Sequence, residues 1–213
     1  MEKFKMQNSK DLAVVILAAG ISSRLGYITK QLLVYKNETL LKIAVKKALE
    51  ISKNVFVVLG HEKEKCEKEL EDFDVNIIYN SNYKKGMGST LSLGIKHTKE
   101  FNHTMVMLCD QPFIPISHFQ ALKKNIQNEN IIASLYEKNK NSKVPAIFPK
   151  KYYDELLKLD VDFGAKEILQ KESCINIQLE KKPETNINDT FFYTNKNVTV
   201  SFNNMLYKNI WDN

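Results

Sequence analysis

The sequence predicts an α/β fold with a mainly parallel sheet, and three observations lead to this prediction. Short runs of consecutive apolar residues, typical of strands buried on both faces, occur at 12–18, 54–59 and 104–109. Segments with apolar residues at helical spacing lie between these runs. Each run stops at a glycine or an aspartate. Repeated strand–helix–strand units favour right-handed crossovers, and ligands then bind beyond the carboxyl ends of the strands.

The elements follow in order along the chain. Residues 12–18 predict the first strand, and 38–51 predict a helix because six apolar residues between 40 and 49 form one face. Asn37 is its candidate cap. We then expect a strand at 54–59, an exposed helix at 62–71, a strand at 75–79, a helix at 89–99, a strand at 104–109, a helix at 116–127, strands at 131–136 and 144–148, helices at 150–158 and 164–170, and a strand at 174–179.

Length and composition indicate one domain, residues 1–213, in a cytoplasmic protein. The net charge of +6 suits anionic small molecules but is too diffuse to indicate nucleic acid. Cys66, Cys109 and Cys174 are far apart and have no metal-site spacing, which favours a reducing compartment. The N-terminus is polar and no 18-residue apolar stretch occurs. We therefore expect no leader and no contact with a membrane. Alternation near 198–202 predicts a strand in the tail 191–213, packed on the domain or at a dimer contact.

The segment after the first strand carries the strongest functional signal. The small residues of Ala18-Ala19-Gly20 allow a tight turn, and hydroxyls and two cations follow, which together suit a polyphosphate. The segment is not an ATPase phosphate loop, because no Gly-Lys-Ser/Thr closes it, and it is not GxGxxG. The residues assigned to the nucleotide here are Leu17, Ala18, Ala19, Gly20, Ser22, Ser23, Arg24 and Lys30.

Asp110, in Cys109-Asp110-Gln111-Pro112, follows a buried strand and precedes a proline-stiffened turn. It would point a hard oxygen ligand into a cleft, and Mg²⁺ prefers one or two protein carboxylates together with phosphate oxygens. The alternative is that Asp110 caps the next turn or helix.

Two further segments are candidate binding sites. In the first, glycines precede hydroxyls at a helix start, which can bind a base edge or a phosphate; the alternative is a glycine turn with Ser89 as the helix cap. In the second, at 144–169, a tight turn separates two helices, and the alternative is that Asp162 caps the second helix. The candidate residues are Gly86, Gly88, Ser89 and Thr90 in the first, and Asp162, Gly164 and Lys166 in the second.

The pattern L-A-A-G-x-S-S-R-x-G-(x)3-K-Q-L-L closely resembles the signature of the MobA-like NTP transferase family, and the resemblance covers roughly residues 12 to 190. It implies a single-domain, Rossmann-like three-layer αβα sandwich of the nucleotide-diphospho-sugar transferase type. C-D-Q-P resembles the metal-binding aspartate motif of the family. G-M-G-S-T-L-S-x-G-I is similar to the base-holding segment of the cytidylyltransferase branch, which favours CTP over GTP. The chain departs from the family in one spacing, since three residues rather than two separate Gly26 and Lys30.

The remaining motifs resemble the branch that acts on the molybdenum cofactor. There, the stretch containing Asp162, Gly164 and Lys166 helps form the acceptor side, although Arg is commoner at the position of Lys166. The family often has D-I-D-T-P-E-D where this chain has N-I-N-D-T. Asp189 is therefore the best candidate for a second metal ligand, with Asn188 as the alternative. A further alternative is that this segment is a surface loop with no role in metal binding.

The resemblance implies a Mg²⁺-dependent transfer of CMP from CTP to the phosphate of molybdopterin, with release of pyrophosphate. Arg24, Lys30 and Asp110 would be catalytic, and Asp110 and Asp189 would hold the metal. A molybdenum hydroxylase or its maturation factor is the implied protein partner. Two alternatives stay open: a cytidylyl- or uridylyltransferase acting on a phosphorylated alcohol or sugar, and a non-catalytic cofactor-binding module.

Overall fold

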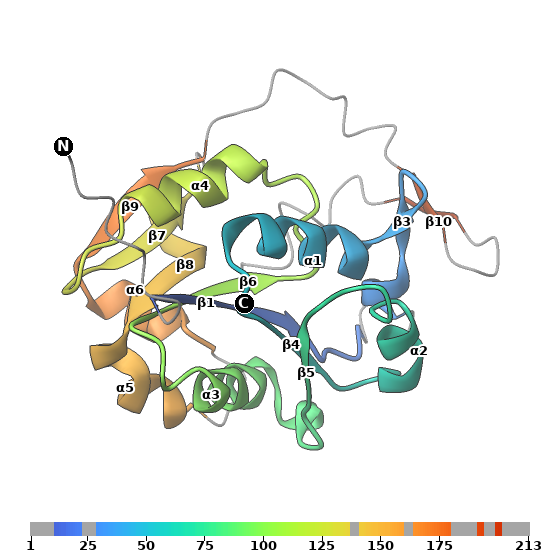
Figure 1. Ribbon diagram of the computed structural model, residues 1–213, viewed down its shortest axis with the longest axis horizontal. Helices are drawn as coiled ribbons and strands as arrows, with labels where there is room; N and C mark the ends of the chain where they lie inside the picture. The colour runs from blue at the N-terminus through green and yellow to red at the C-terminus, as the bar shows by residue number, and fades with distance from the viewer. Residues whose placement is uncertain are drawn as a thin grey trace, which may run out of the picture.

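A computed structural model describes residues 11–22, 29–136, 141–159 and 164–179 and two short strands at 191–193 and 199–201. Its centre is a seven-stranded sheet with the order β5-β4-β1-β6-β8-β7-β9 (Figure 1). Strand β8 runs antiparallel to both of its neighbours, and the other four pairings are parallel. The strands are β1 (Leu12–Ala18), β4 (Val55–Leu59), β5 (Asn76–Tyr79), β6 (His103–Leu108), β7 (Ile131–Leu135), β8 (Ser142–Pro149) and β9 (Cys174–Gln178).

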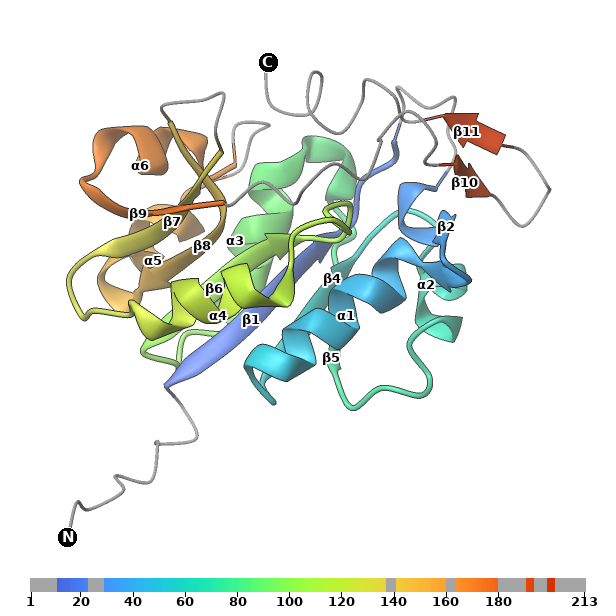
Figure 2. The same ribbon diagram turned by 90° about the horizontal axis from the view of Figure 1, so that it is seen from above.

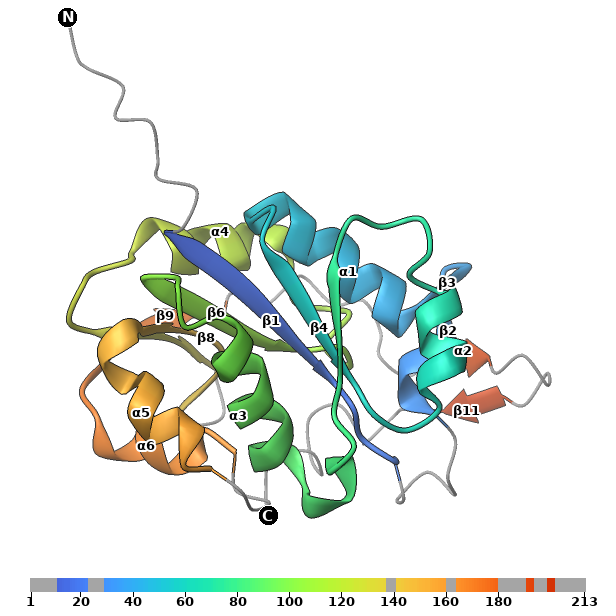
Figure 3. The same ribbon diagram turned by 60° about the horizontal axis from the view of Figure 1, so that its bottom comes forward.

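Helices cover both faces of this sheet, which confirms the predicted three-layer α/β fold. On one face lie α1 (Leu40–Ile51) and α4 (Ile116–Lys124), with α2 (Lys63–Lys68) beyond them toward the β5 edge. On the other face lie α3 (Met87–His97), α5 (Tyr153–Leu157) and α6 (Lys166–Lys171) (Figures 1 and 3). The central strand β1 serves both cores, because Val14 and Ile16 pack with α1 and α4 while Val15 and Leu17 pack with α3. This double burial explains the unbroken apolar run at 12–18.

The predicted helix at 38–51 begins later than expected. Residues Glu38–Thr39 form strand β3, which pairs with β2 (Val34–Tyr35) in a hairpin. Asn37 is not the helix cap, because it occupies the hairpin turn with a φ of 67°, beside Lys36 with a φ of 50°. Two consecutive left-handed residues are typical of a two-residue turn, and asparagine tolerates that conformation. Thr39 is the actual cap, and its side-chain oxygen accepts a hydrogen bond from the Lys42 backbone N–H.

A small second sheet has the order β11-β10-β2-β3. Strands β10 (Phe191–Tyr193) and β11 (Thr199–Ser201) pair with each other, and β10 pairs with β2 at Tyr193 and Val34 (Figure 2). The C-terminal strands therefore lie beside the segment that follows the candidate nucleotide loop. The strand predicted near 198–202 corresponds to β11, and the predicted tail apart from β10 and β11 lies outside the described residues.

Most other elements lie within a few residues of their predicted ranges, with short 3-10 helices at Lys30–Leu32, Tyr83–Lys85 and Lys150–Tyr152. The helix predicted at 89–99 begins at Met87. Within the described ranges, no helix has the length and apolar character needed to cross a membrane.

Candidate active site

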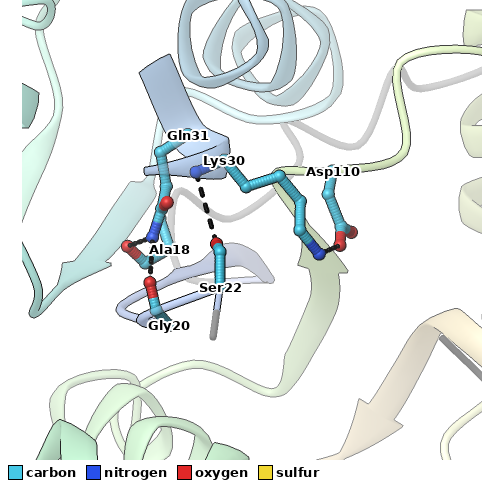
Figure 4. A network of polar contacts seen from close by, with 6 residues as sticks. All are labelled: Ala18, Gly20, Ser22, Lys30, Gln31 and Asp110. Carbon is cyan, nitrogen blue, oxygen red and sulfur yellow. Dashed lines mark hydrogen bonds and ion pairs between the residues drawn. The ribbon is translucent and has the colours of Figure 1, made fainter. Parts of the chain in front are cut away.

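The turn after β1 is open on its outer side and is held from within by Gln31. Ala18 and Ala19 are buried, whereas Gly20 is exposed, and a Cβ added at Gly20 would meet nothing within 4 Å. The buried Gln31 amide donates hydrogen bonds to the carbonyl oxygens of Ala18, at 2.8 Å, and Gly20, at 2.9 Å (Figure 4). Gln31 therefore ties the turn to the short helix that follows it, and no atom of the described residues would meet a Cβ at Gly20. The sequence analysis did not assign Gln31, although it follows Lys30 in the motif.

Lys30 and Asp110 meet at the carboxyl ends of β1 and β6. The Lys30 ammonium lies 2.7 Å from the Asp110 Oδ2, although 80 residues separate them in the chain (Figure 4). The Lys30 backbone N–H also donates to the Ser22 Oγ at 3.3 Å, which ties the start of the short helix to the loop. Only 21% of the Lys30 side chain and 10% of the Asp110 side chain are exposed, so water screens this ion pair only partly.

Three buried side-chain atoms among the described residues have no hydrogen-bond partner: Gln31 Oε1, Asp110 Oδ1 and Gln111 Oε1. All three are oxygen acceptors, and all belong to the segments that the sequence assigns to the nucleotide and the metal. A buried acceptor without a donor requires an explanation, such as an ion or ligand in the functional state. The site therefore offers oxygen atoms to a cation or to a hydrogen-bond donor.

The donor set fits Mg²⁺ held jointly with phosphate. Among the described residues, no three His, Cys, Asp or Glu side chains form a group that could enclose a metal ion. A metal at Asp110 would then take few protein ligands and would complete its shell with phosphate oxygens and water, as Mg²⁺ commonly does. The expected second ligand, Asp189, lies outside the described residues, as does its alternative Asn188.

The loop after β6 is fastened by two elements that carry none of the recognised motifs. The ammonium of Lys47, in α1, donates to the carbonyl oxygens of Pro112, at 2.6 Å, and Ile114, at 2.7 Å. From β2, the ring of Tyr35 meets the ring of Phe113 edge to face, with centroids 5.2 Å apart. No local pattern in the sequence marks Lys47, because its partners lie 65 and 67 residues away.

The glycine segment before α3 is shaped by Asn80, a buried residue directly after β5. The Asn80 amide donates to the Ser89 Oγ, at 3.1 Å, and to the Thr90 Oγ1, at 3.0 Å. Ser89 in turn donates to the Gly86 carbonyl oxygen, at 2.9 Å. Gly86, with a φ of 110°, rather than Ser89 occupies the cap position of α3. Both hydroxyls are thus engaged within the protein, and they fix the backbone at the helix start.

The acceptor candidates lie next to this segment. Gly164 is buried and left-handed, with a φ of 51°, and a Cβ at this position would lie 3.3 Å from the Met87 sulfur. The Ser92 hydroxyl donates to the Leu157 carbonyl oxygen, which joins α3 to α5. Lys166 is exposed at the start of α6. The base and acceptor segments predicted from the sequence are therefore neighbours in space.

The remaining candidates, Ser23, Arg24 and Asp162, lie outside the described residues, and so does Gly26. Cys109, beside Asp110, is buried, and burial together with the Asp110 charge raises the pKa of its thiol, so it stays protonated. A buried, protonated thiol packs as a small apolar residue. Away from the site, burial lowers the pKa of His118 to about 4, and its neutral ring contacts the Ser134 hydroxyl at 2.8 Å.

An exposed turn after the first strand and a lysine–aspartate pair beyond the ends of two adjacent strands place the candidate site at the carboxyl edge of the sheet. Residues 14–177 match the model of the MobA-like NTP transferase domain, and the chain belongs to this family. Over 123 residues it is 26% identical to the molybdenum cofactor cytidylyltransferase of Escherichia coli K12, covering 57% of this chain and 62% of that protein.

Two other similar proteins extend the comparison. The nicotine blue oxidoreductase of Paenarthrobacter nicotinovorans is 37% identical over 108 residues, covering 48% of this chain and 51% of that one. The crystal structure of Rv0371c from Mycobacterium tuberculosis superposes with a TM-score of 0.72 at 19% identity, covering 82% of this chain and 91% of that one. The chain thus spans less than two thirds of the length of these curated relatives, and the solved structure supports the fold.

Proposed function

We propose that this protein transfers CMP from CTP to the terminal phosphate of molybdopterin and releases pyrophosphate. The observation that carries the proposal is the Lys30–Asp110 pair at 2.7 Å, placed beside the open turn at Gly20. The Lys30 ammonium suits a phosphate, and the Asp110 carboxylate suits a divalent cation. A metal–nucleotide complex presents both of these groups. The choice of cytosine rests on the likeness of the Gly86–Thr90 segment to that of cytidylyltransferases.

The chemistry exchanges one phosphorus–oxygen bond for another. An oxygen of the acceptor phosphate attacks the α-phosphorus of CTP in line, and the bond from that phosphorus to the bridging oxygen breaks as pyrophosphate leaves. The attacking oxygen is already ionised at neutral pH, so no general base is needed. Catalysis then consists of positioning and of stabilising charge on the leaving group.

The residues divide this work between them. The turn at Ala18 to Gly20 lets the triphosphate approach the backbone, and Lys30 and Arg24 neutralise its β- and γ-phosphates. Asp110, with Asp189, would hold Mg²⁺, whose charge acts as a Lewis acid on the phosphate oxygens. The Lys30 ammonium contacts Asp110 Oδ2, and nucleotide binding would draw this ammonium toward the phosphates while Asp110 Oδ1 faces the metal.

The neighbouring segments supply the two specificities. We assign the cytosine edge to the backbone around Gly86 and Gly88, whose shape Asn80 fixes through the two hydroxyls. We assign the acceptor to the turn at Gly164 and Lys166, which borders Met87. This adjacency supports the proposal, because the acceptor phosphate must reach the α-phosphorus next to the nucleoside. A molybdenum hydroxylase, or its maturation factor, would receive the product.

Pyrophosphate release with molybdopterin and each of the four nucleoside triphosphates tests the proposal. We expect kcat/KM for CTP to exceed that for GTP and ATP by more than ~10²-fold, since each buried polar group left unpaired by a wrong base costs roughly 1–3 kcal/mol. UTP should lie closer, because the pyrimidine shape is the same and the difference is confined to the edge at ring positions 3 and 4. Preference for GTP would overturn the base assignment. Release only with a phosphorylated alcohol or sugar would overturn the acceptor, and no release with any nucleotide would indicate a binding module.

A further inference from the structure

The loop that directly follows the candidate metal ligand is hydrogen-bonded to α1 through Lys47. Lys47 donates from its ammonium to two main-chain oxygens, those of Pro112 at 2.6 Å and Ile114 at 2.7 Å. An ammonium has three donors, and an ionic hydrogen bond is about twice as strong as a neutral one. Lys47 is partly buried, so these bonds are shielded from competing water. They define where the loop lies relative to the helix layer.

This anchor acts on Asp110, which directly precedes the loop. Asp110 leaves the end of β6, and the chain then turns through Pro112 toward α4. The position of the Asp110 carboxylate therefore depends on the strand on one side and on the anchored loop on the other. A misplacement of about 1 Å at a reacting group can cost on the order of 10²-fold in rate.

We propose that Lys47 is a positioning residue, which fixes the loop after β6 so that the Asp110 carboxylate meets the metal–nucleotide complex in the correct geometry. The inference rests on the proposed function for the identity of that ligand. Lys47 would act through the carbonyl oxygens of Pro112 and Ile114 and not by contact with substrate or metal.

The fold provides a matched control in Lys123. Its ammonium, on α4, donates to the Ile51 carbonyl oxygen at the end of α1, at 2.6 Å, and it is partly buried like Lys47. Lys123→Met removes the same kind of bond between a lysine and a main-chain oxygen, but it leaves the loop after β6 untouched. A purely structural role for Lys47 predicts that the two methionine variants behave alike.

The experiment measures the Kd of the Mn²⁺–CTP complex by calorimetry without acceptor, and kcat and KM by pyrophosphate release. For Lys47→Met, we expect the Kd to rise ~10-fold or more and kcat to fall by a similar factor. Lys123→Met should match the wild type in both. Lys47→Arg keeps several donors on a long side chain and should recover part of the loss. If Lys47→Met does not fold, Lys47→Arg and Lys47→Gln should show graded losses in place of it.

The outcomes separate this inference from the proposed function. Suppose that the wild type binds Mn²⁺–CTP. Lys47 then has no positioning role if Lys47→Met binds this complex and turns over as well as Lys123→Met does. If Lys47→Met does not fold, the same result for both Lys47→Arg and Lys47→Gln leads to the same conclusion. If the wild type binds none of the four Mn²⁺–nucleotide complexes, the proposed function and this inference both fail. If the wild type binds another nucleotide in place of CTP, the base assignment fails, and the same comparison with that nucleotide decides the role of Lys47.

Discussion

Replacing Gly20 by alanine should weaken nucleotide binding without destabilising the fold. The added Cβ meets nothing within 4 Å, and the φ of Gly20 is not left-handed, so neither a clash nor strain opposes it. Removing a glycine also lowers the entropy of the unfolded chain, which stabilises a protein by about 0.4–1 kcal/mol where the conformation is compatible. The free energy of unfolding, from urea denaturation, should therefore stay unchanged or rise slightly.

The same methyl group should obstruct the ligand. If the triphosphate approaches the turn over Gly20, the methyl occupies space that the nucleotide needs, and overpacking of this kind costs about 1–3 kcal/mol. The Kd for CTP, from calorimetry, should then rise roughly 5- to 150-fold. For the same variant, we therefore expect the Kd for CTP to rise while the free energy of unfolding stays unchanged or rises slightly.

Gly60, at the end of the neighbouring strand β4, provides the control. A Cβ at this position would lie 2.6 Å from the Tyr83 Cβ and 2.7 Å from the Ala19 carbonyl oxygen, so the backbone must shift. Gly60→Ala should lose about 1–3 kcal/mol of stability. The reasoning is refuted if Gly20→Ala binds CTP like the wild type, or if it loses as much stability as Gly60→Ala.

Three further predictions concern charge. Asp110→Asn should fold but lose at least ~10²-fold in turnover, on the order of 3 kcal/mol, because the carboxylate that we assign to the metal is gone; normal turnover at saturating Mg²⁺ would contradict this. Arg24→Ala should weaken CTP binding far more than CMP binding in calorimetry, and equal losses would remove Arg24 from the β- and γ-phosphates. The folded-state pKa of His118, about 4, lies below its ordinary value of about 6.5, so the stability gained by keeping the ring neutral is present above pH 6.5 and lost as the pH falls toward 4. Urea unfolding at several pH values should show a shallower loss in His118→Gln, and an identical pH profile would be contrary evidence.

The fold was predictable because its strands are buried in a way that the sequence records. In β1, successive residues enter the two cores alternately, so every position is apolar and the run stands out from its surroundings. The hairpin of β2 and β3 was not predictable by the same means. Its strands have two residues each, which is too few for an alternating pattern. Its turn uses Lys36 and Asn37 in left-handed conformations, and without that knowledge Asn37 was wrongly predicted to be a helix cap.

For the candidate site, the sequence predicts residue types, whereas it does not predict how those residues are bonded to one another. The motifs pointed to Lys30 for phosphate and to Asp110 for metal as separate roles, whereas the structure pairs them across 80 residues. Likewise, the hydroxyl of Ser89 suggested a direct contact with the base, but Asn80 already engages it. Such partners are chosen by how distant elements pack, and a local pattern does not contain that information.

This difference changes where specificity should reside. Because the Ser89 hydroxyl donates to the Gly86 carbonyl oxygen and accepts from Asn80, we expect the main-chain shape that it maintains to contribute to selection of the base. At the other end of the site, Lys47 donates to the carbonyl oxygens of Pro112 and Ile114 in the loop after β6. We therefore expect residues outside the family signature, such as Lys47 and Asn80, to influence the geometry of residues inside it. Two family members with the same signature can therefore differ in activity through positions such as 47 and 80.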